Sequence, residues 1–199
     1  MAGRRVGVSG VREQQAKSRS AERIVLVGFM GAGKTTVGKL LAKKLHCMFI
    51  DLDNEIVDAD GRTISQIFRE AGELGFRELE RSTLHSLITS LDGPEHERVL
   101  SWREKAGIIL AIGGGAFVQP DNAAILRQYG WTSVFLDAPV EELYRRCSPT
   151  DERPLAHHEN LFRQLYEARR SAYMAAEMRV DTGGKTPEQV VEEVLGFGR

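Results

Sequence analysis

Short runs of aliphatic and aromatic residues recur along the chain and alternate with longer stretches in which apolar residues are spaced three or four apart. Short uninterrupted apolar runs are typical of parallel strands that are buried on both faces. On this basis we expect strands at residues 24–27, 48–53, 108–112 and 132–136, and a last short strand near 179–181.

The longer stretches have the spacing of amphipathic helices. Val37, Leu41 and Leu45 form one apolar face after the first strand, and Pro120 and Pro187 stand where proline is favoured, in the first turn of a helix. We therefore expect helices that begin near residues 37, 54, 120, 140, 159 and 187, the second of which extends to residue 91.

This alternation of strands and helices predicts an α/β fold, in which a five-stranded parallel sheet is covered by helices on both faces in a three-layer α/β/α arrangement. A length of 199 residues fits one domain, which we place at 23–199. Residues 1–22 are basic and lack the apolar region that a secretory signal needs, so a flexible head is favoured over a targeting peptide. Residues 92–106 are polar and read as an insertion.

Composition narrows the classes of partner. Hydrophobic residues make up 42% of the chain and charged residues 28%, as in ordinary globular proteins. A net charge of −1 provides no field that would attract nucleic acid or an anionic membrane, and no apolar run is long enough to span a bilayer. Cys47 and Cys147 lie far apart without metal-binding spacing, which disfavours a disulfide or a zinc site. We expect a cytoplasmic protein that binds neither nucleic acid nor a membrane.

The first predicted strand leads into a phosphate-binding motif. Gly28, four further residues and Gly33-Lys34-Thr35 match the pattern G-x-x-x-x-G-K-[ST] between a strand and a helix. Glycine allows backbone N–H groups to approach a phosphate closely, and the start of the helix adds more N–H groups. A glycine-rich turn that binds nothing is the alternative, but the complete motif in this context favours a nucleotide. The expected nucleotide-binding residues here are Gly31, Ala32, Gly33, Lys34, Thr35 and Thr36.

Two carboxylates follow the second predicted strand. Asp51 and Asp53 are two residues apart, so on an extended chain both side chains would point to the same side. They also stand at the carboxyl end of a strand, where open α/β sheets bind ligands. One could hold Mg²⁺ through water while the other accepts a hydrogen bond from a hydroxyl nucleophile. A helix N-cap is the structural alternative for Asp53.

Arginines and glycines supply further candidates for the site. Arg77 lies in the predicted helix 54–91, where Glu80 is placed to hold it in position, although a solvated helix face would give the same pattern. Three glycines at 113–115 end the strand 108–112, where they would permit either close approach to a ligand or a tight turn. The polar loop at 147–158 contains Arg153 and suggests a lid over phosphates, although an exposed loop with incidental arginines is also consistent.

Together these features resemble the shikimate kinase family over about residues 23–197. The matching segments are Gly-Phe-Met-Gly-Ala-Gly-Lys-Thr-Thr at 28–36, Phe-Ile-Asp-Leu-Asp at 49–53, Gly-Glu-x-Gly-Phe-Arg at 72–77, Gly-Gly-Gly at 113–115, Arg-Pro-Leu at 153–155 and Arg-x-x-x-Tyr at 169–173. The phosphate-binding loop is common to many families, whereas this ordered combination is far more specific. The resemblance implies a P-loop kinase fold with a substrate-binding helical region at 52–91 and a lid at 147–158.

The resemblance also implies a reaction, in which ATP with Mg²⁺ phosphorylates the 3-hydroxyl of shikimate in the pathway toward chorismate. Arg77 and Arg169 would bind the substrate carboxylate, although the neighbouring Arg170 leaves that second assignment open. Asp53 would accept from the ring hydroxyls, and its service as a general base also stays open. The glycines expected at the substrate are Gly113, Gly114 and Gly115.

The same resemblance assigns the phosphate-side residues. Thr35 would bind Mg²⁺ directly and Asp51 through water, while Lys34 and Arg153 would neutralise charge on the transferred group. Arg146 and Arg153 would contact ATP, and Lys185 lies in the turn at 183–187 where the family packs adenine. A monomer is the expected state.

Three departures from the family pattern accompany the resemblance. The stretch 92–106 is longer than usual, Ser171 replaces a common proline, and the head at 1–22 has no counterpart. Two other functions stay open at this point: a related kinase of another small hydroxy acid such as gluconate, and a non-catalytic regulator. A regulator would be expected to lack Lys34, Asp53 or an arginine, and the chain retains them all.

Overall fold

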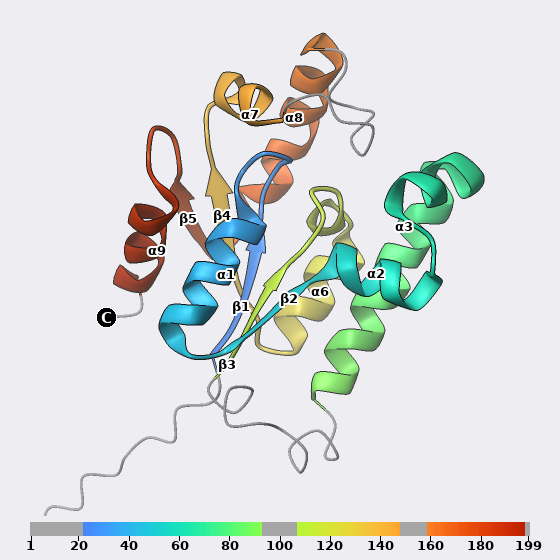
Figure 1. The fold of residues 1–199 in the computed structure, drawn as a ribbon, viewed down its shortest axis with the longest axis horizontal. Coiled ribbons are helices and arrows are strands. Elements are labelled where there is room, and N and C mark those ends of the chain that lie inside the picture. Colours follow the sequence, from blue (N-terminus) through green and yellow to red (C-terminus); the bar gives the residue numbers. More distant parts are fainter. Residues whose placement is uncertain (1–21, 93–106, 148–158, 198–199) are drawn as a thin grey trace, which may run out of the picture.

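The computed structural model describes residues 22–92, 107–147 and 159–197. Five strands, all paired in parallel, form one sheet in the order β2-β3-β1-β4-β5 (Figure 1). Their bounds are β1 Glu22–Val27, β2 Met48–Asp51, β3 Gly107–Ala111, β4 Thr132–Asp137 and β5 Met178–Asp181. The predicted five-stranded parallel sheet is confirmed.

Helices cover both faces of this sheet (Figure 1). On one face α1 (Lys34–Leu45) packs against β2 and β3, and α9 (Pro187–Gly196) packs against α1 and β5. On the other face α6 (Pro120–Gln128) contacts β4, α3 (Ile64–Leu91) and the short 3₁₀ helix η1 (Ala116–Val118). Two further helices, α7 (Val140–Arg146) and α8 (Glu159–Tyr173), follow β4 and contact each other. The three-layer α/β/α arrangement is confirmed.

The hydrophobic core holds the strands in register. Val25, Ile109 and Val134, one from each of the three central strands, have no exposed surface. Full burial of such a side chain contributes about 1.5–3 kcal/mol. The register aligns the strand ends, since Ala111 of β3 pairs with Leu26 of β1 on one side and with Asp51 of β2 on the other. The loops that follow these strands therefore meet at one edge of the sheet.

Residues 54–91, predicted to be helical, are helical in the structure, but a short break divides them into two helices that the prediction did not separate. The first, α2, spans Leu52–Asp60. The second, α3, begins after a capping box in which the Thr63 side chain accepts from the Gln66 N–H at 3.3 Å and the Gln66 side chain accepts from the Thr63 N–H at 2.8 Å. The apolar spacing continues across this boundary, which is why periodicity alone did not reveal it.

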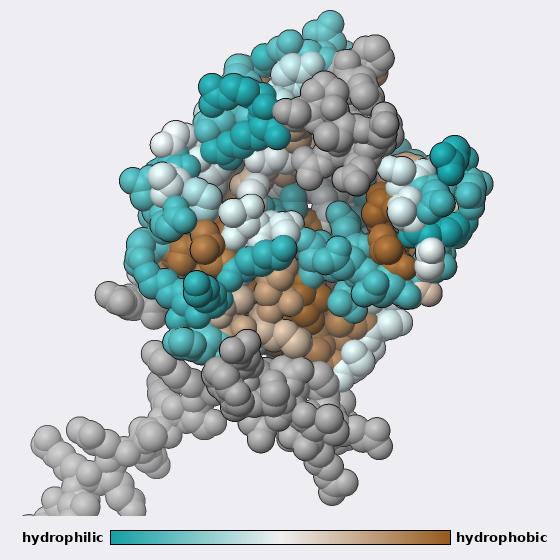
Figure 2. Space-filling model, viewed as in Figure 1, coloured by the Kyte–Doolittle hydropathy of each residue, from teal (hydrophilic) through white to brown (hydrophobic). Residues whose placement is uncertain are grey.

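Some expectations fall outside the described residues. They concern nearly all of the head at 1–22, of the insertion at 92–106 and of the lid at 147–158, including Arg153. Within the described residues, none of the helices has the length and apolar character required to cross a bilayer. In Figure 2, hydrophilic side chains cover much of the visible face, and hydrophobic ones gather in a few places, one of them on the right, where α2 and α3 lie.

Candidate active site

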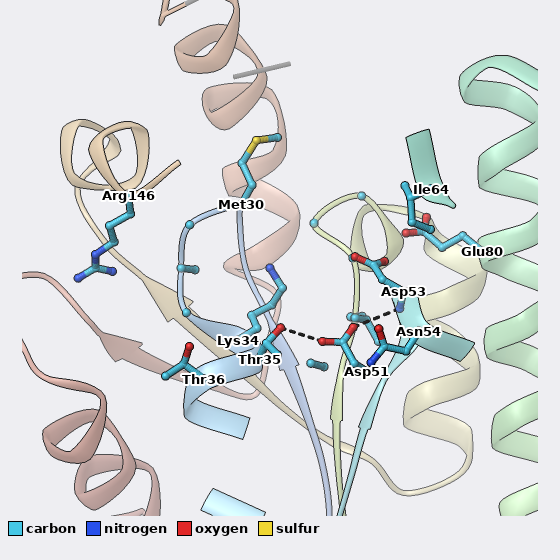
Figure 3. A pocket seen from close by; sticks show the side chains of 18 of the residues that line it. Met30, Lys34, Thr35, Thr36, Asp51, Asp53, Asn54, Ile64, Glu80 and Arg146 are labelled. Carbon is cyan, nitrogen blue, oxygen red and sulfur yellow. Dashed lines mark hydrogen bonds between the residues drawn. The ribbon is translucent and has the colours of Figure 1, made fainter. Parts of the chain in front are cut away.

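A cleft lies at the carboxyl ends of the strands, and every predicted site residue that the structure describes lines it. These residues come from the phosphate-binding loop and α1, from the β2–α2 junction, from α3, from the loop after β3, and from α7, α8 and the β5–α9 loop. Figure 3 shows Asp53 and Glu80 on one side of the phosphate-binding loop and Arg146 on the other. The fold therefore brings distant segments of the sequence together around one space.

The phosphate-binding loop has a backbone that requires glycine. Gly31 has φ 81°, and a Cβ atom there would lie 2.7 Å from the Leu143 carbonyl oxygen. Lys34 occupies the first position of α1, and its ammonium donates to the carbonyls of Gly28 at 2.8 Å and Phe29 at 3.1 Å. These contacts keep the positive charge at the loop, in the position from which it could reach a phosphate.

The two aspartates have different structural roles. Strand β2 ends at Asp51, which caps α2, since its Oδ1 accepts from the Asp53 backbone N–H at 3.2 Å. Asp53 therefore lies in the first turn of α2, and the expectation of two side chains on one face of an extended chain was wrong. The helix N-cap is Asp51, not Asp53, because the helix begins two residues earlier than predicted. Asp53 still lines the cleft and faces it (Figure 3).

The residues at this junction fit a magnesium ion. The Thr35 hydroxyl donates to Asp51 Oδ2 at 2.8 Å, which places two hard oxygen atoms side by side next to the phosphate-binding loop (Figure 3). In the part of the chain that the structure describes, no group of three or more His, Cys, Asp or Glu side chains is arranged to hold a metal ion. Mg²⁺ typically binds through one or two protein oxygens together with substrate phosphates, so a sparse oxygen site of this kind suits it.

Arg77 is held in the cleft by a buried carboxylate. Its guanidinium donates to Glu80 Oε2 at 2.6 Å, and Glu80 has no exposed surface. The same Oε2 atom also accepts from the Gln119 side chain at 3.2 Å. Burial raises the pKa of Glu80, and the nearby Asp53 raises it further, while Arg77 and Arg169 oppose this change. The expectation that Glu80 holds Arg77 in position is confirmed.

Two of the glycines at 113–115, Gly113 and Gly115, lie so close to these side chains that a larger residue would displace them. A Cβ atom on Gly115 would lie 2.4 Å from the Arg77 guanidinium carbon, and one on Gly113 would lie 2.5 Å from Glu80 Oε1. The middle residue, Gly114, accepts a hydrogen bond from the Tyr173 hydroxyl through its carbonyl oxygen. Burial raises the pKa of Tyr173, which keeps the hydroxyl protonated and able to donate. The segment forms a turn in which the Ala116 N–H donates to the Gly113 carbonyl at 3.0 Å, and its close approach to a ligand stays a prediction.

The structure separates the two adjacent arginines of α8. Arg169 is buried, lines the cleft, and lies over the Phe29 ring at 5.9 Å from its centroid. Arg170 points elsewhere, donating to Asp137 Oδ2 at 3.2 Å and to the Tyr166 hydroxyl at 3.2 Å. Of the pair, only Arg169 is available to a ligand in the cleft.

The far end of the cleft gathers the residues expected at the nucleotide. Arg146 donates to Glu142 Oε1 at 2.5 Å and to the Thr182 carbonyl at 3.1 Å. Glu142 also accepts from the Gly184 N–H at 3.1 Å, so one carboxylate joins α7 to the β5–α9 loop. In the same loop, Lys185 pairs with Glu193 of α9 at 2.7 Å.

One residue in the cleft was missed from sequence. Glu73 lies between the two arginines, with its Oε1 atom 3.4 Å from an Arg77 nitrogen and 3.8 Å from an Arg169 nitrogen. Its spacing of four from Arg77 on a helix was a usable signal for the first contact. The contact with Arg169, almost a hundred residues away in sequence, had no local signal.

Comparison with known proteins identifies a family to which this chain is similar. The shikimate kinase family model matches residues 30–197. A shikimate kinase of Persephonella marina is 39% identical over 174 residues, which cover 87% of this chain and 96% of that protein. A shikimate kinase of Geobacter sulfurreducens is 42% identical over 179 residues, which cover 88% of this chain and 90% of that protein.

Solved structures agree with the sequence comparison. The structure of shikimate kinase from Acinetobacter baumannii in complex with shikimate superposes with a TM-score of 0.77 at 35% identity, and the match covers 89% of this chain and 93% of that one. A shikimate kinase structure from Aquifex aeolicus superposes with a TM-score of 0.71 at 35% identity, with 87% and 94% covered. The P-loop kinase fold, the arrangement of the cleft and these matches lead to one conclusion: the chain belongs to the shikimate kinase family.

Proposed function

We propose that this chain transfers the γ-phosphoryl group of ATP to the 3-hydroxyl of shikimate, giving shikimate 3-phosphate and ADP in the biosynthesis of chorismate and aromatic amino acids. The observation that carries the proposal is the placement of two guanidinium groups, those of Arg77 and Arg169, in the same cleft as a complete phosphate-binding loop. Shikimate has one carboxylate and three hydroxyls, so it needs a cationic contact at one end and access to a phosphate donor at the other.

The carboxylate end of the substrate is assigned to the arginine pair. Both guanidiniums already contact one carboxylate, that of Glu73, at 3.4 Å and 3.8 Å. A guanidinium binds a carboxylate through two parallel hydrogen bonds, which fixes the orientation as well as the charge. The buried Glu80 holds Arg77 in position, so that little rotamer freedom is lost on binding.

The hydroxyl end is assigned to Asp53 and the glycine loop. Asp53 lies in the first turn of α2, beside the phosphate-binding loop, where it can accept a hydrogen bond from the attacking hydroxyl and orient it in line with the γ-phosphate. Phosphoryl transfer depends mainly on such positioning and on charge stabilisation. The backbone of Gly114, held by Tyr173, faces the same space.

Charge on the transferred group is assigned to cations of the loop and lid. Lys34 would move from the Gly28 and Phe29 carbonyls, where it lies at 2.8 Å and 3.1 Å, to the phosphate oxygens. Arg153, which lies outside the described residues, stays a prediction for the same role. Mg²⁺, when bound at Thr35 and Asp51, neutralises phosphate charge and favours departure of ADP.

Two alternatives are not favoured. Shikimate kinases match this chain at 39% and 42% identity, and a shikimate kinase structure matches it at 35%, which argues against a kinase of gluconate. Lys34, Asp53 and both arginines of the cleft are present, which argues against a non-catalytic regulator. We further propose a cytoplasmic monomer, because ATP is abundant in the cytoplasm and one chain supplies all of the described cleft.

Product identification tests this proposal. The full chain is incubated with Mg-ATP and shikimate, and the product is analysed by phosphorus NMR. We expect ADP and one phosphate ester whose phosphorus couples to the proton on C3. Turnover should fall at least about 100-fold in Asp53→Asn, whereas Asp58→Asn, a change at an exposed position of the same helix, should retain it. An ester at another hydroxyl, or ADP formation without any ester, would contradict the proposal.

A further inference from the structure

The carboxylate of Glu73 lies in the place where a bound carboxylate would be expected. Its Oε1 atom is 3.4 Å from Arg77 Nη2 and 3.8 Å from Arg169 Nη2, so one oxygen atom contacts both guanidiniums. The arginines themselves are well covered, with 19% and 10% of their side chains exposed. The Glu73 side chain is 58% exposed, so its ion pairs with the two arginines are weak.

The backbone before Glu73 explains how its side chain reaches this position. Gly72 has φ 69° and ψ −175°, a non-helical conformation that interrupts α3 and starts a new helical segment at Glu73. A positive φ of this kind is readily adopted by glycine. A carboxylate in the first turn of the new segment is also favoured by the helix dipole.

We infer that Glu73 is an internal competitor for the carboxylate of the substrate, which lowers the affinity of the arginine pair for any carboxylate ligand. This inference rests on the proposed function, since it assigns Arg77 and Arg169 to that carboxylate. A substrate with only a carboxylate must displace Glu73 with little in return. A substrate that also places hydroxyls on Asp53 and the glycine loop gains enough contacts to displace it. Glu73 thereby weakens the binding of both kinds of acid by the same factor, so that only an acid with these further contacts still binds tightly.

The contacts indicate the size and direction of the effect. Ion pairs of a half-exposed carboxylate are worth about 0.2–1 kcal/mol, which corresponds to a factor of about 1.4–5 in an equilibrium constant. Loss of the Glu73 charge also removes repulsion of the incoming carboxylate. Glu73→Gln should therefore bind carboxylates more tightly, and acids with and without hydroxyls should gain by a similar factor.

The experiment compares three titrations by calorimetry on the full chain: shikimate, cyclohexanecarboxylate and Mg-ATP. Cyclohexanecarboxylate has the ring and the carboxylate of the substrate but no hydroxyls. In Glu73→Gln we expect the Kd of shikimate to fall about two- to fivefold, that of cyclohexanecarboxylate to fall by a similar factor, and that of Mg-ATP to stay unchanged. Glu70→Gln is the matched control, because Glu70 lies on the same helix but pairs with Arg62 at 3.0 Å and does not line the cleft.

The outcomes separate this inference from the proposed function. Unchanged or weaker carboxylate binding in Glu73→Gln would overturn the inference, since it would mean that Glu73 is neutral or holds the arginines in place. A gain shared equally by Mg-ATP or by Glu70→Gln would overturn it too, as a general charge effect. If the wild-type chain fails to phosphorylate shikimate, the proposed function fails, and the cyclohexanecarboxylate titration still reports on competition at the arginine pair.

Discussion

At the residue scale, the polar side chains of the cleft already have hydrogen-bond partners within the protein before any ligand binds. Lys34 donates a hydrogen bond to a carbonyl of the phosphate-binding loop, and Thr35 donates one to Asp51. Arg77 donates one to Glu80. Each pair holds a side chain close to the position in which the proposed reaction would use it, which reduces the ordering cost of binding. Glu80 has the largest energetic cost of these residues, because it is a carboxylate with no exposed surface.

The buried Glu80 predicts a pH dependence of stability. Its pKa is raised by burial, so the native state holds the proton more tightly than the unfolded state does. The resulting stabilisation is fully present below the ordinary glutamate pKa and is lost as the pH rises through the raised value. Each tenfold tightening of proton binding corresponds to about 1.4 kcal/mol. Relative to Glu80→Gln, wild-type stability should therefore decline with rising pH.

Urea unfolding of both proteins across the weakly acidic to neutral range measures this difference. Glu78→Gln is the control of opposite sign, since its hydrogen bond with Arg81 lowers the pKa of the exposed Glu78 carboxyl. The stabilisation from Glu78 is present above its ordinary pKa and is lost as the pH falls, and it should be small because the pair is exposed. A wild-type advantage over Glu80→Gln that grows with pH would contradict our account of the buried carboxylate.

At the element scale, the loop after β3 and the helix α3 form one unit. Gly115 has φ −97° and ψ −17°, which any residue can adopt, so space and not backbone conformation restricts this position. The Arg77 guanidinium occupies the space that a side chain would need. Replacement of Gly115 by a larger residue should therefore displace the flexible guanidinium end of Arg77 and leave the backbone in place.

Gly115→Ala tests this coupling directly. We expect the KM for shikimate to rise about tenfold or more, because loss of a charge-assisted contact costs about 1.5–3 kcal/mol. The KM for ATP and the melting temperature should stay near their wild-type values. Gly196→Ala is the matched control, since a Cβ atom there would meet no atom within 4 Å. An unchanged KM for shikimate would show that Arg77 does not contact the substrate.

The same unit shows what the sequence could predict. Apolar runs located the first four strands, because buried parallel strands have a composition that stands out locally, whereas the last strand contains Arg179 and Asp181. Glu80 and Arg77 were paired correctly, since a spacing of three on a helix is a local relation. The break between α2 and α3, the cap at Asp51 and the contact of Glu73 with Arg169 were not predicted. They depend on side-chain hydrogen bonds or on tertiary packing, which apolar periodicity does not encode.

At the scale of the whole molecule, strand order places the chemistry at one edge of the sheet. Strand β1 is central, with β3 on one side and β4 on the other, so the loops after these strands surround the phosphate-binding loop. Helix α3 brings the proposed carboxylate-binding side to this edge, and the β5–α9 loop brings the expected nucleotide side. One open cleft thus joins the two sites that a phosphoryl transfer requires.

The most direct test of this account is a coupled ADP-release assay with Mg-ATP. Shikimate is compared with gluconate and with a reaction that contains no acceptor. We predict turnover that depends on shikimate, is near background with gluconate, and falls at least about tenfold in kcat/KM when Arg77 is changed to Ala. ATP binding without shikimate-dependent turnover, or equal turnover with gluconate, would contradict the central claim that this cleft is built for shikimate.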